Sequence, residues 1–296
     1  MEGMERMVGM RVAVTGAAGL VGRKTVEALK RAGWEVLPLS RAARPGYLTT
    51  DYTVNSLAAI FAGADAVVHL AAERGGEGCL YQNQQLTENV LLAMKQSDRC
   101  RRIVYLSSIS VYSGEETLPW SEQTLPRPEG EYGLSKLAGE HLCAIYQKAG
   151  IRYTVLRCAH ILGIEDRGYM LSRFFDGAFR RQAICVTGKS VARREFIYVK
   201  DAAGGILWAL GSEESVGQTF NLGYGKGYTN LQIAGMVNRA FGNEGNLRYI
   251  AEREEGIRSS YTDVRKITKA GFRPAFTIET AMQDLFREYC RLKRES

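Results

Sequence analysis

A phenol and an amine stand four residues apart in the stretch EYGLSK, as Tyr132 and Lys136. If this stretch is helical, positions i and i+4 share one face, so both side chains point into a common space. The preceding apolar run, RRIVYLSSISVYS, ends in a serine cluster whose hydroxyls could bind a substrate oxygen. A phenol beside a cation that lowers its pKa can exchange a proton with that oxygen. These residue types predict proton transfer at a carbinol or ketone carbon.

A glycine-rich loop near the start of the sequence is the second chemical feature. The stretch VAVTGAAGLVGRK places Gly16, Gly19 and Gly22 at three-residue intervals between an apolar run and a helical pattern. Glycines there allow a tight turn and let a pyrophosphate approach the helix N-terminus, where free N–H groups favour anions. Such turns also occur for packing alone, but the position between first strand and first helix favours a dinucleotide. We therefore predict dinucleotide contacts from this loop, including Leu20 and Val21.

The next strand bears on the choice between NAD and NADP. An acid about 20 residues after the glycine loop usually binds the ribose 2′-OH of NAD, whereas arginine accommodates the 2′-phosphate of NADP. Here the run WEVLPL ends in Ser40 and Arg41, with Arg44 close by and no carboxylate between them. The arginines could also be ordinary surface residues. We predict NADP as the preferred cofactor and NAD as the alternative.

The elements that must position these residues follow from the apolar pattern. Short apolar runs near 11–15, 34–40, 65–72, 101–110 and 151–159 alternate with helical patterns. Such alternation predicts an α/β fold, a doubly wound parallel Rossmann sheet covered on both faces. We assign the Rossmann domain to residues 10–165. Residues 166–296 are expected to form mainly a smaller, partly interleaved α/β substrate lobe, with late segments, about 196–222, returning to the sheet.

Composition narrows the class of protein. With 296 residues, 45% hydrophobic and 24% charged, the chain is typical of an ordinary soluble globular protein. It has no long apolar run and no secretory leader pattern, so we expect no membrane span and a cytoplasmic location. Six cysteines without CxxC spacing argue against a metal site or a disulfide framework. The net charge of +7 is dispersed, which argues against nucleic acid and suits a small phosphate-bearing substrate.

Five motifs in order, TGAAGLVG, HLAA, YLSSISVY, YGLSK and FIYVKDAA, resemble the extended short-chain dehydrogenase/reductase family. Within it the chain is similar to the NAD-dependent epimerase/dehydratase branch that acts on nucleotide sugars, from about residue 10 to about 290. The resemblance implies Ser108 as the catalytic serine, Tyr132 as the acid/base and Lys136 as its lysine. It also implies further cofactor contacts from Asp51, Tyr52, Leu70, Ala71 and Ala72. Substrate contacts are expected from Arg74, Asn83, Ser108, His160 and Arg194, with Arg194 on a diphosphate.

Departures from the pattern of this branch narrow the expected chemistry. Dehydratases of the branch carry an Asp-Glu pair after the catalytic residue, but Ile109 and Ser110 stand there. Double epimerases of the fucose-synthase type have a cysteine at the position of Ser110, so that activity is doubtful too. The segment ERGGEGCLYQNQQ lacks the Ser and Pro pattern common in UDP-galactose 4-epimerases. His160 replaces a usual asparagine, and a lone histidine there is more often structural than functional.

The remaining prediction is an enzyme that uses NAD(P) and acts on a nucleotide-linked sugar. It would transfer a hydride at a carbinol or ketone carbon, as a 4-keto reductase or as an epimerase. The alternatives are a dehydrogenase of a non-nucleotide substrate, such as a sugar acid, steroid or flavonoid, and a non-catalytic NADP(H)-binding module. The resemblance further implies a homodimer through the helix that carries Tyr132. Leu134, Leu137, Leu142 and Ile145 suit that contact, and suit packing on the sheet equally.

Overall fold

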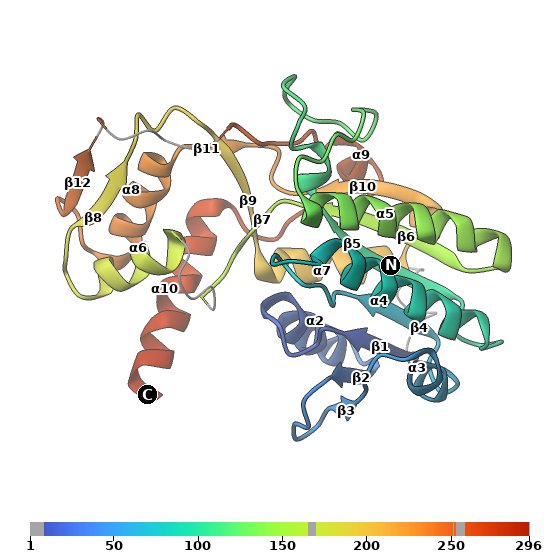
Figure 1. Ribbon diagram of the computed structural model, residues 1–296. Coiled ribbons are helices and arrows are strands. Elements are labelled where there is room, and N and C mark those ends of the chain that lie inside the picture. Colours follow the sequence, from blue (N-terminus) through green and yellow to red (C-terminus); the bar gives the residue numbers. More distant parts are fainter. Residues whose placement is uncertain (1–8, 165–169, 251, 253–257, 296) are drawn as a thin grey trace.

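The protein is described by a computed structural model that covers residues 9–164, 170–250, 252 and 258–295. Figure 1 shows a twisted sheet with helices on both faces and, beside it, a smaller lobe built from yellow, orange and red segments. The arrangement confirms the predicted α/β class. No helix in the described ranges is both long enough and apolar enough to cross a membrane.

Seven parallel strands form the large sheet in the order β10-β6-β5-β4-β1-β2-β3. Strand β1 lies inside this sheet, with β2 on one side and β4 on the other. The carboxyl ends of strands beside such a reversal of order leave a crevice where ligands bind in doubly wound folds. The strands are β1 (Arg11–Thr15), β2 (Glu35–Ser40), β3 (Leu48–Thr49), β4 (Ala66–His69), β5 (Arg102–Ser108), β6 (Arg152–Cys158) and β10 (Gln218–Leu222).

Helices cover both faces of this sheet. On one face α2 (Leu20–Arg31) packs against α7 (Val199–Gly211), and α3 (Val54–Phe61), α4 (Cys79–Lys95) and α5 (Glu131–Tyr146) pack side by side on the other. Successive residues of β1 alternate between the two cores, with Val12 and Val14 in one and Ala13 in the other. Because both faces are buried, the central strands are mainly apolar.

The smaller lobe brings together segments that lie far apart in the sequence. Helices α6 (Met170–Phe179), α8 (Asn230–Phe241) and α10 (Ile278–Glu295) pack with a pair of parallel strands, β8 (Ile184–Thr187) and β12 (Leu247–Ile250). Aromatic rings fill its core, and Phe175 stacks on Phe241 with the ring centroids 5.6 Å apart.

A three-stranded sheet lies between the lobe and the large sheet (Figure 1). It consists of β7 (His160–Leu162), β9 (Arg194–Tyr198) and β11 (Gly227–Tyr228). After β9 the chain returns to the large domain as α7 and β10, and α9 (Arg265–Lys269) packs against β10. The remaining short elements are the 3₁₀ helices η1 (Ile109–Tyr112), η2 (Gln147–Ala149) and η3 (Glu213–Ser215).

A buried ion pair fixes α5 to the sheet. Glu140, one helical turn after Lys136, accepts hydrogen bonds from the guanidinium of Arg157 on β6 at 2.6, 3.0 and 3.1 Å. The Ser107 hydroxyl at the end of β5 donates to the same carboxylate at 2.5 Å. The two charged side chains are only 7% and 8% exposed, so each depends on the other for its charge to be balanced.

A second buried network supports the loop after β4. The Thr15 hydroxyl oxygen accepts the backbone N–H groups of Leu70 and Ala71 at 3.1 and 3.2 Å, and lies 2.7 Å from Nδ1 of His69. Thr15 can therefore donate its proton to Nδ1, which places the imidazole proton on Nε2, 3.2 Å from the Thr87 hydroxyl. Burial keeps this imidazole neutral and lowers its pKa to about 3.

We predict that replacing Glu140 destabilises the fold far more than replacing an exposed acid. Glu140→Gln leaves the Arg157 guanidinium buried without its counter-charge, so the free energy of unfolding should fall by about 3–5 kcal/mol. Glu213, which pairs with Arg152 at the surface, gives the matched control. Glu213→Gln should change stability by about 1 kcal/mol or less. Urea unfolding measures both, and equal losses would contradict the role given to the buried pair.

Acid should destabilise the protein partly through His69. Its folded pKa of about 3 lies below the ordinary histidine value, so the unfolded chain binds more protons below about pH 6.5. The stability that the neutral imidazole contributes is therefore lost as pH falls through this window, by about 2 kcal/mol at pH 5. Urea unfolding at pH 7.5 and pH 5 should show a smaller acid-induced loss in His69→Asn. The exposed His141 provides the control, and a His69→Asn protein as acid-sensitive as His141→Asn would refute the assignment.

Candidate active site

The glycine loop forms a cradle that larger side chains would fill. Gly16 has a φ of +65°, and a Cβ there would lie 2.7 Å from the backbone nitrogen of Ala71. A Cβ on Gly22 would overlap the carbonyl oxygen of Gly16. The twelve-residue helix α2 begins directly after Gly19, with no side chain capping it and no acid in its first turn. Its N–H groups and dipole can therefore receive an anion such as a pyrophosphate.

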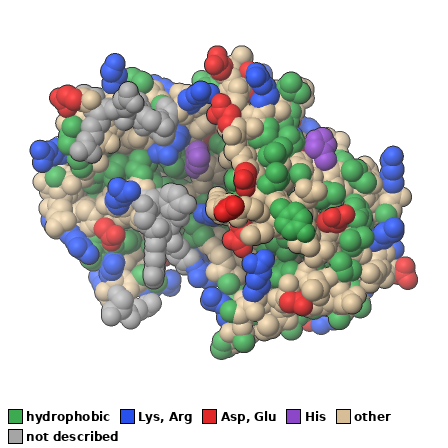
Figure 2. Space-filling model, in the orientation of Figure 1, with side chains coloured by type: hydrophobic (Ala, Val, Ile, Leu, Met, Phe, Trp, Pro, Cys, Tyr) green, Lys and Arg blue, Asp and Glu red, His purple; other side chains and the backbone are tan. Residues whose placement is uncertain are grey.

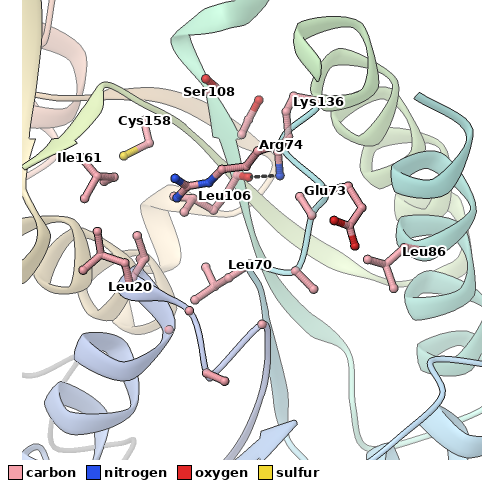
Figure 3. A pocket seen from close by; sticks show the side chains of 18 of the residues that line it. Leu20, Leu70, Glu73, Arg74, Leu86, Leu106, Ser108, Lys136, Cys158 and Ile161 are labelled. Atoms are coloured by element: carbon pink, nitrogen blue, oxygen red, sulfur yellow. Dashed lines mark hydrogen bonds between the residues drawn. The ribbon is translucent and has the colours of Figure 1, made fainter. Parts of the chain in front are cut away.

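A cavity of roughly 340 Å³ opens at the carboxyl ends of β1, β2, β4 and β5. Figure 3 shows its wall, with the blue loop and helix of the glycine cradle below and α5 with Lys136 above. The predicted substrate contact Arg74 lines it, together with most of the predicted cofactor and catalytic residues: Gly16, Gly19, Leu20, Val21, Gly22, Ser40, Arg41, Tyr52, Leu70, Ala71, Ala72, Ser108, Tyr132 and Lys136.

Lys136 is held at the back of this cavity. Its ammonium donates a hydrogen bond of 2.9 Å to the backbone oxygen of Leu106 on β5, drawn as the dashed line in Figure 3. The ammonium also lies 5.8 Å from the ring centroid of Tyr132, as expected for positions i and i+4 of one helix. Burial lowers the pKa of Lys136 to about 8, an effect that Arg74 increases and Glu140 opposes. The amine thus carries its positive charge at neutral pH.

The phenol of Tyr132 lines the same cavity as Lys136. Burial raises the pKa of Tyr132 to about 12, while the Arg74 charge and a hydrogen bond with Ser108 act in the opposite direction. Ser108 in turn accepts the backbone N–H of Ser110 at 3.1 Å and donates to its hydroxyl at 3.0 Å. The serine hydroxyl is therefore fixed beside the phenol, at the end of the strand that carries it.

The first cavity, which contains the glycine cradle and is called the dinucleotide cavity below, continues towards the lobe. A second cavity of roughly 270 Å³ shares Arg74, Ser108 and Tyr132 with the first and adds Ser110, His160, Arg194 and Phe196. A third, of roughly 740 Å³, shares Arg194 with the second and lies between α6 and β8. In Figure 2 the surface is hollowed between the lobe and the sheet domain, with blue basic side chains on its walls. The three cavities together form a path from the glycine cradle into the lobe.

Arg194 stands where the second and third cavities meet. It donates a hydrogen bond of 2.7 Å to the side-chain oxygen of Asn230, and its guanidinium lies 5.7 Å from the ring centroid of Phe196. Arg173 and Arg180 line the third cavity as well. This end of the path is therefore basic, which suits phosphate groups. His160 lines the second cavity, with its ring centroid 5.9 Å from that of Phe196.

Two predicted contacts lie outside the three cavities. Asp51 is exposed, and its carboxylate accepts the backbone N–H and hydroxyl of Thr53 at 3.0 and 2.9 Å, just before α3. Asn83 is buried on α4, where its amide binds the backbone of Glu73 and the Ser135 hydroxyl. The amide of Asn83 is occupied by the chain itself, whereas the exposed carboxylate of Asp51 holds the turn before α3 through one of its oxygens.

Glu73 lines the dinucleotide cavity although the sequence argument did not include it. Its carboxylate lies 3.0 Å from the guanidinium of Arg41, which itself stands 5.6 Å from the ring centroid of Tyr52. The signal was present in the sequence, because Glu73 directly follows HLAA at the carboxyl end of a predicted strand. What the sequence did not show is that this strand end lies opposite Arg41.

Comparison with known proteins agrees with this geometry. Residues 12–223 match the family described as the NAD dependent epimerase/dehydratase family. A UDP-N-acetylglucosamine 4-epimerase from Bacillus cereus has a solved structure 39% identical in sequence, with a TM-score of 0.87 over 95% of this chain and 99% of that one. The structure of MoeE5 in complex with UDP-glucuronic acid and NAD is 26% identical, with a TM-score of 0.83 over 95% and 99%.

A sequence relative covers a similar length. The GDP-L-fucose synthase of Azorhizobium caulinodans is 25% identical over 308 aligned positions, spanning 95% of this chain and 96% of its own. The family match over residues 12–223 includes the glycine cradle, the strand ends and the helix with Tyr132 and Lys136. All residues that line the first cavity therefore lie within the part of the chain that matches the family. The chain belongs to the NAD dependent epimerase/dehydratase family.

Proposed function

We propose that the protein is an NAD-dependent 4-epimerase of a UDP-linked sugar. One observation carries the proposal, namely that Ser108 and Tyr132 lie where the dinucleotide cavity opens into the path that leads to Arg194. A sugar whose diphosphate reaches Arg194 would therefore have its ring beside Ser108 and Tyr132. The 39% identical UDP-N-acetylglucosamine 4-epimerase supports this choice of reaction and of nucleotide.

The chain's own residues would move the proton of the reaction. NAD, when bound, supplies a hydride acceptor that becomes a hydride donor in the return step. Tyr132 takes the proton from the sugar hydroxyl as the carbon loses its hydride, and returns the proton to the same oxygen after the ring has turned. Ser108 holds that oxygen by a hydrogen bond, and the Lys136 charge stabilises the phenolate form of Tyr132. The same three residues would serve a 4-keto reductase.

Two side chains after Ser108 favour epimerisation over dehydration. Ile109 is buried and apolar, and Ser110 lines the second cavity as a neutral hydroxyl. Elimination of water from a sugar needs an acid and a base on neighbouring atoms, which neither of these side chains supplies near neutral pH.

The cofactor proposed is NAD. The preference for NADP that Ser40 and Arg41 predict has no support in the family description or in the NAD complex of MoeE5. The structure adds the carboxylate of Glu73, which pairs with Arg41 and was absent from the sequence argument.

A homodimer and a cytoplasmic location complete the proposal. Leu134 and Ile145 of α5 are 43% and 61% exposed and three turns apart on one side of the helix. Leu137 and Leu142 pack instead against the cores of the sheet domain. Figure 2 shows hydrophobic side chains gathered at the right, over α4 and α5. Covering this face with a second copy would remove the exposed apolar surface from water.

Removal of the Tyr132 hydroxyl should abolish turnover without emptying the cofactor site. In Tyr132→Phe the proton of the sugar hydroxyl has no acceptor, so kcat should fall by about a thousandfold or more. The amount of NAD that co-purifies should stay close to that of the wild type. Product analysis by NMR and nucleotide analysis by mass spectrometry measure the two quantities. Normal turnover in Tyr132→Phe would exclude this phenol as the proton carrier.

The diphosphate contact gives an independent test. Arg194→Ala removes charge-assisted hydrogen bonds, so KM for UDP-linked sugars should rise about tenfold to a hundredfold. A free sugar or small neutral alcohol should be affected far less, because it has no phosphate to lose. Arg248→Ala removes an exposed arginine of the same lobe and serves as the control. If Arg194→Ala weakens both kinds of substrate equally, the residue does not hold the diphosphate.

A further inference from the structure

The strand that usually selects the dinucleotide lacks an acid in this protein. In doubly wound folds, an acid at the end of the second strand binds the ribose 2′-OH of NAD, and an arginine nearby accommodates the 2′-phosphate of NADP. Here β2 ends in Ser40, and Arg41 follows in the wall of the cavity. Taken alone, β2 therefore has the pattern of an NADP site.

An acid reaches the end of β2 from the loop that follows a different strand. Glu73 belongs to the loop after β4, which lies on the other side of β1 from β2. Its carboxylate crosses to the guanidinium of Arg41 and approaches it to 3.0 Å, and both side chains line the cavity. Arg41 also lies 5.6 Å from the ring centroid of Tyr52. The ion pair therefore bridges the loops on both sides of the glycine cradle.

The backbone that carries this carboxylate is held firmly. Asn83 accepts the backbone N–H of Glu73 at 2.7 Å and donates to its carbonyl oxygen at 2.9 Å. Asn83 is itself 3% exposed and is tied to Ser135 of α5 at 3.0 Å. A change in the Glu73 side chain would leave these backbone bonds in place. Asn83 thus acts on the cofactor site by placing Glu73.

We infer that Glu73 makes the site select NAD over NADP by occupying Arg41 and supplying the carboxylate that β2 lacks. The inference rests on the dinucleotide site of the proposed function. A 2′-phosphate would stand beside the carboxylate and compete with it for the guanidinium of Arg41, which costs free energy because like charges repel. The 2′-hydroxyl of NAD can instead donate a hydrogen bond to the carboxylate.

The expected size of the selectivity for NAD follows from the solvent exposure of Arg41 and Glu73. Arg41 and Glu73 are 60% and 45% exposed, so water screens their charges and each can still turn aside. We therefore expect discrimination of about tenfold from Glu73, the factor that corresponds to about 1.4 kcal/mol.

The test is a titration of the protein with NADH and with NADPH, followed by nicotinamide fluorescence, after any co-purifying nucleotide has been identified and removed. The wild type should bind NADH more tightly. Glu73→Gln keeps the shape of the side chain and removes its charge, so the ratio of Kd for NADPH to Kd for NADH should fall about tenfold. In the Arg41→Gln background, the same substitution should change the ratio by less than it does in the wild type, because no guanidinium is freed and only the direct effect of the carboxylate on the 2′ group remains.

Glu77→Gln is the matched control, because it removes the same charge from the same loop at a residue outside the cavity wall. Its ratio of Kd values should stay within about twofold of the wild type. Two results would overturn the inference: a wild type that binds NADPH more tightly, or a Glu73→Gln ratio no different from that of Glu77→Gln. Because no sugar enters the titration, selective binding by a protein that fails to convert UDP-linked sugars would count against the proposed function alone.

Discussion

The attachment of α5 to the end of β5 is the constraint on which the site depends. Lys136 donates a hydrogen bond to the backbone oxygen of Leu106. One turn later, Glu140 accepts a hydrogen bond from Ser107 and pairs with Arg157. These contacts set the distance between the phenol on the helix and the serine on the strand. Glu140 also opposes the effect of burial on the pKa of Lys136, so the same carboxylate positions the helix and helps to keep its amine charged.

The site also depends on a continuous path of cavities from Ser108 and Tyr132 to the lobe. Segments around 170–187, 230–250 and 278–295 build the lobe and pack through aromatic rings, while β7 and β9 connect it to the sheet domain. Arg194 on β9 therefore stands at a fixed place relative to Ser108 on β5. We infer that the separation between Ser108 and Arg194 matches the length of a sugar diphosphate. The sugar would react beside Ser108, and the diphosphate would be recognised by Arg194.

The sequence was sufficient for the central part of the large sheet because β1, β2, β4 and β5 are mainly apolar and alternate with helical patterns, whereas the two-residue edge strand β3 left no such signal. The sequence and the family resemblance together also predicted one site for the glycine loop, the strand-end Ser108 and the helical Tyr132, and the structure places Gly16, Ser108 and Tyr132 on one cavity. The sequence could not reveal contacts between different strand ends. Glu73 and Arg41 lie 32 positions apart, and their pairing depends on the order of β2, β1 and β4. The resemblance implied a substrate contact for Asn83, and the structure adds that its amide is hydrogen-bonded to the backbone of Glu73, which the sequence alone could not show.

The most direct measurement of the central claim is NMR analysis of UDP-N-acetylglucosamine labelled with deuterium at C4, incubated with the purified protein and no added cofactor. We predict conversion to the C4 epimer with the deuterium retained at C4, because the hydride that leaves the carbon returns to it within the same site. A protein loaded with NAD that leaves UDP-linked sugars unchanged, or that needs one added NADPH for each product formed, would contradict the proposed epimerase.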